Sequence, residues 1–381
     1  MGIKTVAEIN KYQSVSINPM EHPNQIFELY SVPSFDNQYP EIIKGSEIGS
    51  SKITVEEGDV LVCKINPRIN RVWVVKHHTK YPLLASSEWI VVRNGEIESN
   101  YLKWYFSSPP FRNMLTSQVA GIGGSLTRAQ PKQVAKYPVP IPARSVQQNI
   151  VCYLDKVSDL ISLRKQQLAK LDALVKSRFV EMFGDPISNP HGFDKVALSE
   201  LADIKIGPFG SLLHKEDYIE GGYALLNPSH IIDGKIAPDN KLTISTKKYE
   251  ELSAYQLKAG DVVMGRRGEM GRCAVVPCDG YLCGTGSLLI RTKGEVTADY
   301  IQKIISFPSF KKMIEDMAVG QTMPNLNVPI VSNFQIIKPP FKVQKSYYAF
   351  VNQTDKSKWA IQQSLDKLEL LKKALMQKYF G

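Results

Sequence analysis

The fold of this chain is decided by the stretch VQQNIVCYLDKVSDLISLRKQQLAKLDALVKSRFVEMF, Val146–Phe183. Apolar residues recur along it at alternating spacings of four and three, as on the buried face of a long amphipathic helix. Only Arg164 and Arg178 interrupt this seam. A helix with such a seam needs a partner helix. The seam consists of Ile150, Leu154, Val157, Ile161, Leu168, Leu171 and Val175.

The partner is the C-terminal stretch VQKSYYAFVNQTDKSKWAIQQSLDKLELLKKALMQKYF, Val343–Phe380. A shift of 197 residues places Val146 on Val343 and Phe183 on Phe380, with further matches between them and no gap. Such self-similarity indicates an internal repeat. We expect the two helices to pair within one chain, because a tethered partner has a high effective concentration. A coiled coil between two copies of the chain is the alternative. The second seam is assigned to Val351, Ile361, Leu365, Leu368 and Leu375.

The segments before the two helices repeat as well. Each helix follows a proline-rich strand end, at Tyr137–Pro142 and Phe334–Pro340, where the fixed φ of proline stops a strand and permits a helix start. Lys258–Val276 corresponds to Glu56–Val75. Short β-like runs mixed with helices predict an α+β fold. The expected domains are residues 1–142 and 185–340, each followed by a long helix, at residues 143–184 and 341–381.

Within the first domain, strands are expected at Asp59–Ile65, Arg71–Val75 and Glu88–Val92, which are rich in β-branched residues and bounded by turn residues. A helix is expected at Asn100–Phe106 and Pro110–Val119, ending at the glycine cluster of Gly121, Gly123 and Gly124.

The composition predicts a folded protein with a polyanionic partner. The 381 residues are 43% hydrophobic and 22% charged, and the net charge is +10, which favours partners such as nucleic acid. Five cysteines and an N-terminus without an apolar segment predict a reduced, cytoplasmic protein without a signal peptide. No apolar run reaches the roughly 18 residues that cross a membrane.

Three stretches resemble the specificity subunits of type I restriction-modification systems. They are PVPIPARSVQQNIVCYLDKVSDLISLRKQQLAKLDALVKSRFVEMFG (Pro138–Gly184), its second copy PPFKVQKSYYAFVNQTDKSKWAIQQSLDKLELLKKALMQKYFG (Pro339–Gly381), and GDVVMGRRGEMGRCAVV (Gly260–Val276). The resemblance covers the whole chain in the family's order of domain, helix, domain, helix. One departure is the absence of an acidic residue before Gln147 and Gln344, which many such proteins carry.

The resemblance implies two target-recognition domains that each read half of a split DNA site. Two antiparallel helices would hold these domains apart as a coiled coil with pseudo-two-fold symmetry and dock two modification (methyltransferase) subunits. Restriction subunits would complete the complex, and S-adenosylmethionine, ATP and Mg would be bound by the partners, with no cofactor and no catalysis on this chain. A helix of 38 residues is about 57 Å long, the length of about 17 base pairs. Because the loops of the two domains differ, we expect an asymmetric site.

Candidate DNA contacts are basic, amide and hydroxyl side chains on loops, because these groups pair with phosphates and base edges. Each of them also has a simpler interpretation as a solvated turn residue. In the first domain they are Lys64, Asn66, Arg68, Arg71, Lys76, His77, His78, Ser125, Thr127, Arg128 and Gln130. In the second domain they are Ser211, His214, Lys215, Arg266, Arg267, Gln321, Thr322, Asn325 and Asn327.

Two other functions are alternatives, a self-sufficient DNA methyltransferase or nuclease and a coiled-coil scaffold that does not read DNA. Asn227-Pro228-Ser229-His230 is similar to the Asn-Pro-Pro-aromatic signature of adenine methyltransferases, but it lacks the aromatic residue and a preceding glycine-rich loop. It is interpreted as a turn. The sequence has no phosphate-binding Gly-x-x-x-x-Gly-Lys-Ser/Thr loop and no convincing nuclease cluster.

No metal site is expected. Cys273, Cys278 and Cys283 lack the paired spacing of zinc ligands, and their apolar neighbours indicate buried strand cysteines. The adjacent His77 and His78 would point to opposite sides of an extended chain, so we interpret them as loop residues.

Overall fold

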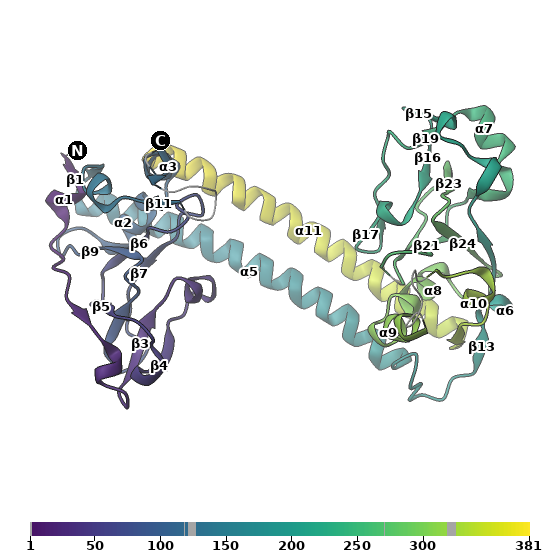
Figure 1. Cartoon of the computed structure of the whole chain (residues 1–381), viewed down its shortest axis with the longest axis horizontal. Helices are drawn as coiled ribbons and strands as arrows, with labels where there is room; N and C mark the ends of the chain where they lie inside the picture. Colours follow the sequence, from purple (N-terminus) through teal and green to yellow (C-terminus); the bar gives the residue numbers. More distant parts are fainter. Residues whose placement is uncertain (1, 118, 121–126, 270, 318–324) are drawn as a thin grey trace. The chain divides into compact units, whose positions relative to one another are not determined.

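The chain divides into two units, one of Met1–Leu168 with Ala360–Gly381 and one of Ala169–Trp359. This computed structural model describes residues 2–117, 119–120, 127–269, 271–317 and 325–381, without the side chains of residues 119, 120 and 211 (Figure 1). Within these residues, no helix is both long and apolar enough to cross a membrane.

The two long helices predicted from the seam are present as α5 (Arg144–Phe183) and α11 (Phe341–Phe380), each of 40 residues. Each is drawn as one unbroken helix in Figure 1. They run antiparallel in both units. In the first unit the start of α5 shares a core with Met376 and Phe380 near the end of α11. In the second unit the end of α5 packs on Tyr347 near the start of α11.

The seam side of both helices is shielded from solvent. The twelve seam residues named from the sequence are all buried or half-buried. The two arginines that interrupt the seam are half-buried as well and keep their guanidinium groups bonded. Arg164 donates to the Ser364 hydroxyl across the helix pair at 3.2 Å, and Arg178 donates to Glu181 at 2.7 Å. Long polar stems of this kind cover apolar surface while the charge stays solvated.

The first domain consists of a five-stranded sheet and a three-stranded antiparallel sheet. The five-stranded sheet has the order β2 (Ser16–Ile17), β5 (Lys52–Thr54), β8 (Leu83–Ala85), β3 (Ile26–Tyr30) and β4 (Glu41–Lys44). The other has the order β7 (Val72–Val74), β6 (Val60–Cys63) and β9 (Trp89–Val92), at the positions of the three predicted strands. Short pairs and helices complete the domain: β1 (Gly2–Thr5) with β12 (Pro138–Ile141), β10 (Val119–Ala120) with β11 (Arg128–Ala129), α1 (Val6–Ile9), α2 (Ser99–Phe106), α3 (Pro109–Ser117) and α4 (Pro131–Val134).

The second domain repeats this plan. Its five-stranded sheet has the order β15 (Tyr218–Ile219), β19 (Thr243–Ile244), β16 (Tyr223–Leu226), β23 (Tyr281–Cys283) and β20 (Gln256–Leu257). Its four-stranded sheet has the order β14 (Ala202–Ile206), β24 (Ser287–Thr292), β21 (Val262–Gly265) and β22 (Cys273–Val275). The remaining elements are β13 (Lys195–Ala197) with β25 (Gln335–Ile337), β17 (Ile231–Ile232) with β18 (Lys235–Ile236), α6 (Leu198–Leu201), α7 (Thr246–Glu251), α8 (Ala298–Ile305), α9 (Pro308–Met317) and α10 (Val328–Ser332).

The register shows how closely the domains correspond. β3 pairs with β8 in parallel, and β16 pairs with β23 in parallel, while every other pair in these larger sheets is antiparallel. The α+β fold and the internal repeat expected from the sequence are therefore confirmed.

The helix expected at residues 100–106 and 110–119 is formed at both stretches, but as two helices rather than one, and Val119 lies in β10. The chain forms two helices, α2 and α3, which are interrupted at Ser107 and Ser108. Pro109 explains the break, because proline disfavours helical backbone in the residue before it and donates no backbone hydrogen bond. Pro308 begins α9 in the same way.

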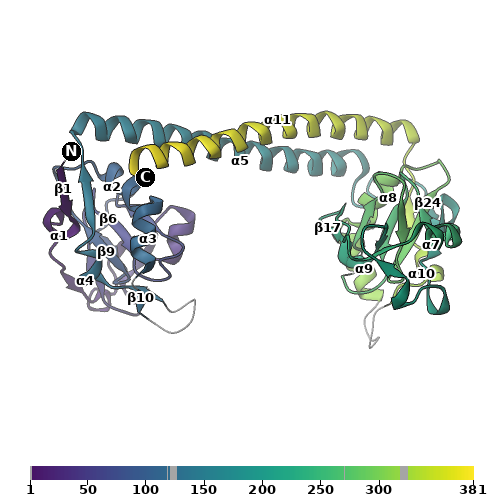
Figure 2. The same cartoon turned by 90° about the horizontal axis from the view of Figure 1, so that it is seen from above.

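Each long helix ends in a phenylalanine that completes a domain core. Phe380 of α11 packs against Tyr101 of α2, with ring centroids 5.8 Å apart. Phe183 of α5 packs against Tyr300 of α8 at 5.3 Å. Figure 2 shows the C-terminal end of α11 beside α2 and α3. Each long helix therefore follows one domain in the sequence, and its terminal phenylalanine completes the core of the other domain.

A buried glutamine near the start of each long helix bonds both the preceding loop and the start of an earlier helix of the same domain. Gln147 accepts a hydrogen bond from the Glu98 backbone N–H at 3.0 Å and donates to the Pro142 carbonyl at 2.8 Å. Gln344 accepts from the Thr297 backbone N–H at 3.2 Å and also donates to a proline carbonyl. Both side chains are almost completely buried, so these bonds satisfy groups that would otherwise be costly to bury.

Candidate nucleic-acid interface

Two distant segments meet at the loop between β6 and β7 in the first domain. The Asn66 backbone N–H donates to the Thr127 carbonyl, and the Ala129 N–H donates to the Lys64 carbonyl, both at 2.9 Å. Asn66 has a left-handed backbone conformation (φ 46°), which asparagine tolerates better than most residues. This pairing brings together five of the predicted contacts: Lys64, Asn66, Thr127, Arg128 and Gln130.

The side chains of this loop differ in how available they are. Arg68 and Gln130 are exposed, whereas Arg128 is exposed but forms an ion pair with Glu88 at 3.1 Å. Arg71 has only 16% of its side chain exposed and lies 3.8 Å from Asp36. We therefore assign Arg71 to the base of the loop rather than to its outer surface.

Lys76, His77 and His78 belong to a different loop, which follows β7 rather than preceding it. Their side chains are exposed, but buried side chains form hydrogen bonds with the backbone of the loop. The Tyr30 hydroxyl bonds both the N–H and the carbonyl of Lys76. The fully buried Glu28 accepts hydrogen bonds from the backbone N–H groups of His78 and residue 79. This loop therefore presents exposed basic side chains on a hydrogen-bonded backbone, separately from the loop before β7.

Glu28 shapes the candidate interface but is not among the residues predicted from the sequence. The available signal was an acidic residue inside the otherwise apolar strand IFELY. The corresponding strand β16 carries Ala224 at this register position, opposite Tyr281. The buried carboxylate is therefore specific to the first domain.

In the second domain the corresponding two segments, the β21–β22 loop and the segment before α10, meet with different side chains. The Leu326 N–H donates to the Arg266 carbonyl at 2.9 Å, as Ala129 does to Lys64 in the first domain. The Arg266 guanidinium also donates to the Asn325 side-chain oxygen at 2.9 Å. Burial and the neighbouring Arg267 lower the pKa of Arg266. Arg267 is exposed. The loop therefore carries two cations, Arg266 and Arg267, and Arg266 lies beside the Asn325 amide.

The other predicted contacts of the second domain are not gathered at this loop. Asn327 caps α10 by accepting a hydrogen bond from the Ile330 N–H at 3.0 Å, so its side chain has a structural role. The asparagine before Val-Pro was a helix-start signal. His214 and Lys215 are exposed on a short turn before β15. Four further predicted contacts lie outside the described residues: Ser125 of the first domain, and Gln321, Thr322 and the side chain of Ser211 of the second.

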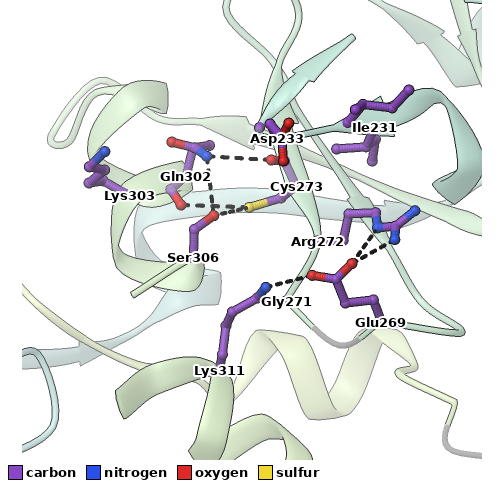
Figure 3. A pocket seen from close by; sticks show the side chains of 12 residues that line it. Ile231, Asp233, Glu269, Gly271, Arg272, Cys273, Gln302, Lys303, Ser306 and Lys311 are labelled. Atoms are coloured by element: carbon purple, nitrogen blue, oxygen red, sulfur yellow. Dashed lines mark hydrogen bonds and ion pairs between the residues drawn. The ribbon is translucent and has the colours of Figure 1, made fainter. Parts of the chain in front are cut away.

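An ionic cluster ties the β21–β22 loop to α9. The Glu269 carboxylate lies 2.8 Å from the Lys311 ammonium and 2.6 Å from the Arg272 guanidinium. Figure 3 shows the carboxylate between the two cations, at the edge of a pocket of about 390 Å³. The two cations lower the pKa of Glu269 to about 2, so the carboxylate stays ionised at neutral pH.

The described residues contain no group of three or more His, Cys, Asp or Glu side chains that could hold a metal ion. Cys273 and Cys283 are buried in strands, and burial raises the pKa of each thiol to about 12. The expectation that Cys278 is also buried is wrong, because it is exposed in the turn between β22 and β23. Residues 227–230 form a short 3₁₀ turn with His230 buried.

Comparison with known proteins finds a family whose model matches both repeats. The model of the type I restriction modification DNA specificity domain matches residues 2–173 and 190–371. The specificity subunit of the type I restriction enzyme MjaVIII from Methanocaldococcus jannaschii is 21% identical over 352 residues, which cover 87% of this chain and 80% of that protein.

Two solved structures share the fold over all of this chain. A chain from a study of complex assembly and conformational transition of the type I R-M system has a TM-score of 0.65 at 18% identity, with 97% of it covered. The type I restriction-modification S subunit from M. genitalium has a TM-score of 0.59 at 12% identity, with 96% covered.

Proposed function

Because this chain belongs to the type I restriction-modification DNA specificity family, we propose that it is the subunit that reads a bipartite, asymmetric DNA site for a methyltransferase and restriction complex. Each domain would read one half of the site. The helices α5 and α11 would set the distance between the halves, since 40 residues of helix extend about 60 Å.

One observation carries this proposal. Both domains use the same backbone pairing to present the loop before β7 or β22, but they present different side chains there. The first domain offers Lys64 and Arg128, and the second offers Arg266 and Asn325. Arginine pairs bidentately with guanine, and asparagine with adenine. A shared scaffold with different polar side chains is what two unlike half-sites require.

An apolar stripe on α5 supports the docking of modification subunits. In the first unit Val146, Tyr153, Leu160 and Leu163 are between 43% and 55% exposed, and helical spacing places them along one side of the helix, next to the seam. Exposed apolar patches of this kind mark surfaces for other proteins. We propose that S-adenosylmethionine, ATP and Mg are bound by modification and restriction subunits and that this chain, in the cytoplasm with its DNA, binds no cofactor and catalyses no step.

Exchange of one domain tests the proposal. Residues 1–142 are replaced by the first domain of another specificity subunit, and the methylated sites are mapped by single-molecule sequencing in a host that lacks other methylation. We expect one half of the methylated motif to change while the other half and the spacer stay the same. The reciprocal exchange of residues 185–340 is the matched control and should change the other half. A change in both halves from a single exchange would contradict the division of labour.

A further inference from the structure

A pocket in the first domain has two cations and no anion. It lies between the β6–β7 loop and the start of α3, has a volume of about 490 Å³, and is lined by Arg68, Ser107, Pro109, Arg112, Asn113 and Thr116. Arg68 and Arg112 are exposed. Within the described part of the chain, neither guanidinium group has a hydrogen bond or an ion pair. Two like charges on one pocket repel each other unless an anion lies between them.

The internal repeat places a second pocket at the same position in the second domain. Ser107 and Arg112 at the α2–α3 junction correspond to Ser306 and Lys311 at the α8–α9 junction, and both of these line the second pocket. Arg68 comes from the loop that corresponds to the Glu269 loop. The second pocket already holds an anion of its own, because the Glu269 carboxylate bonds both Lys311 and Arg272 (Figure 3). The second domain therefore pairs its cations internally at this junction, whereas the first domain has an arginine, Arg68, on the corresponding loop.

We infer that the pocket of the first domain binds a phosphodiester group of the DNA backbone between Arg68 and Arg112, where the second domain has an internal ion pair between Glu269 and Lys311. Guanidinium groups suit this ligand because they present several N–H donors in a plane that matches phosphate oxygens. The inference rests on the proposed function, since it assigns one of the backbone contacts that position a reader on its site.

The two domains are consequently expected to hold the DNA backbone unequally at this point. In the second domain the carboxylate neutralises two cations and would repel a phosphate. In the first domain both cations are free to release counterions when a phosphate binds. Removing the carboxylate from the second domain should therefore create a phosphate contact, while removing the arginines from the first should abolish one.

Salt dependence of DNA binding by the full-length chain tests this. Binding to a fluorescent duplex is measured between about 50 and 200 mM salt, where each phosphate that the protein neutralises adds about 0.9 to the slope of log affinity against log salt. We expect the double variant Arg68→Gln, Arg112→Gln to lower the slope by about 0.9. The variant Glu269→Gln should raise it by a similar amount. A double variant of Lys4 and Lys136 to Gln is the control, because it removes the same charge from exposed positions of the first domain outside the pocket.

The outcomes separate this inference from the proposed function. If the unaltered chain binds DNA without salt dependence, the proposed function fails and the inference fails with it. If the unaltered chain shows a steep slope that the arginine variant shares, only the phosphate site is wrong. Thermal unfolding in the presence of inorganic phosphate tests whether the pocket binds a free phosphate ion instead of the DNA backbone. Stabilisation that depends on Arg68 and Arg112, together with an unchanged DNA slope, would overturn the assignment to DNA.

Discussion

Phe183→Ala is expected to lower the free energy of unfolding of the second unit by about 3 to 5 kcal/mol, the usual cost of removing a buried phenylalanine ring. The ring is completely buried. It contacts Tyr300 of α8 and Tyr347 of α11, each with centroids 5.3 Å apart. Its loss would leave a cavity where three helices meet, and this is why the effect should exceed that of most single substitutions.

Hydrogen exchange of backbone amides, measured separately for α2 and α8, checks this prediction. Phe183→Ala should speed exchange in α8, and Phe380→Ala should speed exchange in α2, because each phenylalanine completes a different core. The control is Leu163→Ala on α5, whose side chain is 53% exposed, and it should change neither. Equal acceleration of both helices by Phe183→Ala would contradict the assignment of the ring to one unit.

Asp59→Asn is expected to cost the first unit about 1.5 to 3 kcal/mol, the range for hydrogen bonds that involve charged groups. Asp59 is 1% exposed and accepts two hydrogen bonds from the Arg93 guanidinium, at 2.7 and 2.8 Å, and one from the Glu56 backbone N–H. The carboxylate raises the pKa of Arg93. An asparagine would turn one of these acceptors into a donor that faces a donor.

The same bonds recur between Asp261 and Arg291, so Asp261→Asn should destabilise the second unit similarly. Glu56→Gln is the matched control, because Glu56 also pairs with Arg93 but is 71% exposed. Exposed ion pairs contribute less than about 1 kcal/mol. Thermal and denaturant unfolding of the three variants measure these differences. An equal effect of Glu56→Gln and Asp59→Asn would show that burial is not the cause.

The long helices and the repeat could be predicted because they rest on patterns that are local in sequence. Apolar residues at Ile150, Leu154 and Val157 define a helix face without knowledge of the partner, and the unbroken 197-residue shift identifies the partner. The break at Ser107 does not show in the apolar pattern, which continues on both sides of it. Pro109 is the local signal that marks the break.

The candidate interface was harder to predict because its pairings are not local. Arg266 and Asn325 are 59 positions apart, and nothing in either loop indicates that the other is near. Arg71 lies on the same loop as Arg68 but is largely buried, and the sequence does not show which side chains of a loop face inward. Glu269, the anion of the second pocket, likewise bonds a lysine that is 42 positions away.

The most direct test of the central claim is single-molecule methylome sequencing in a methylation-free host that carries this chain, with and without its modification subunit. We expect a split, asymmetric motif methylated at adenine to appear only when both are present. A motif that appears with this chain alone would show that the chain is itself an enzyme, and would contradict its assignment as a non-catalytic reader of DNA.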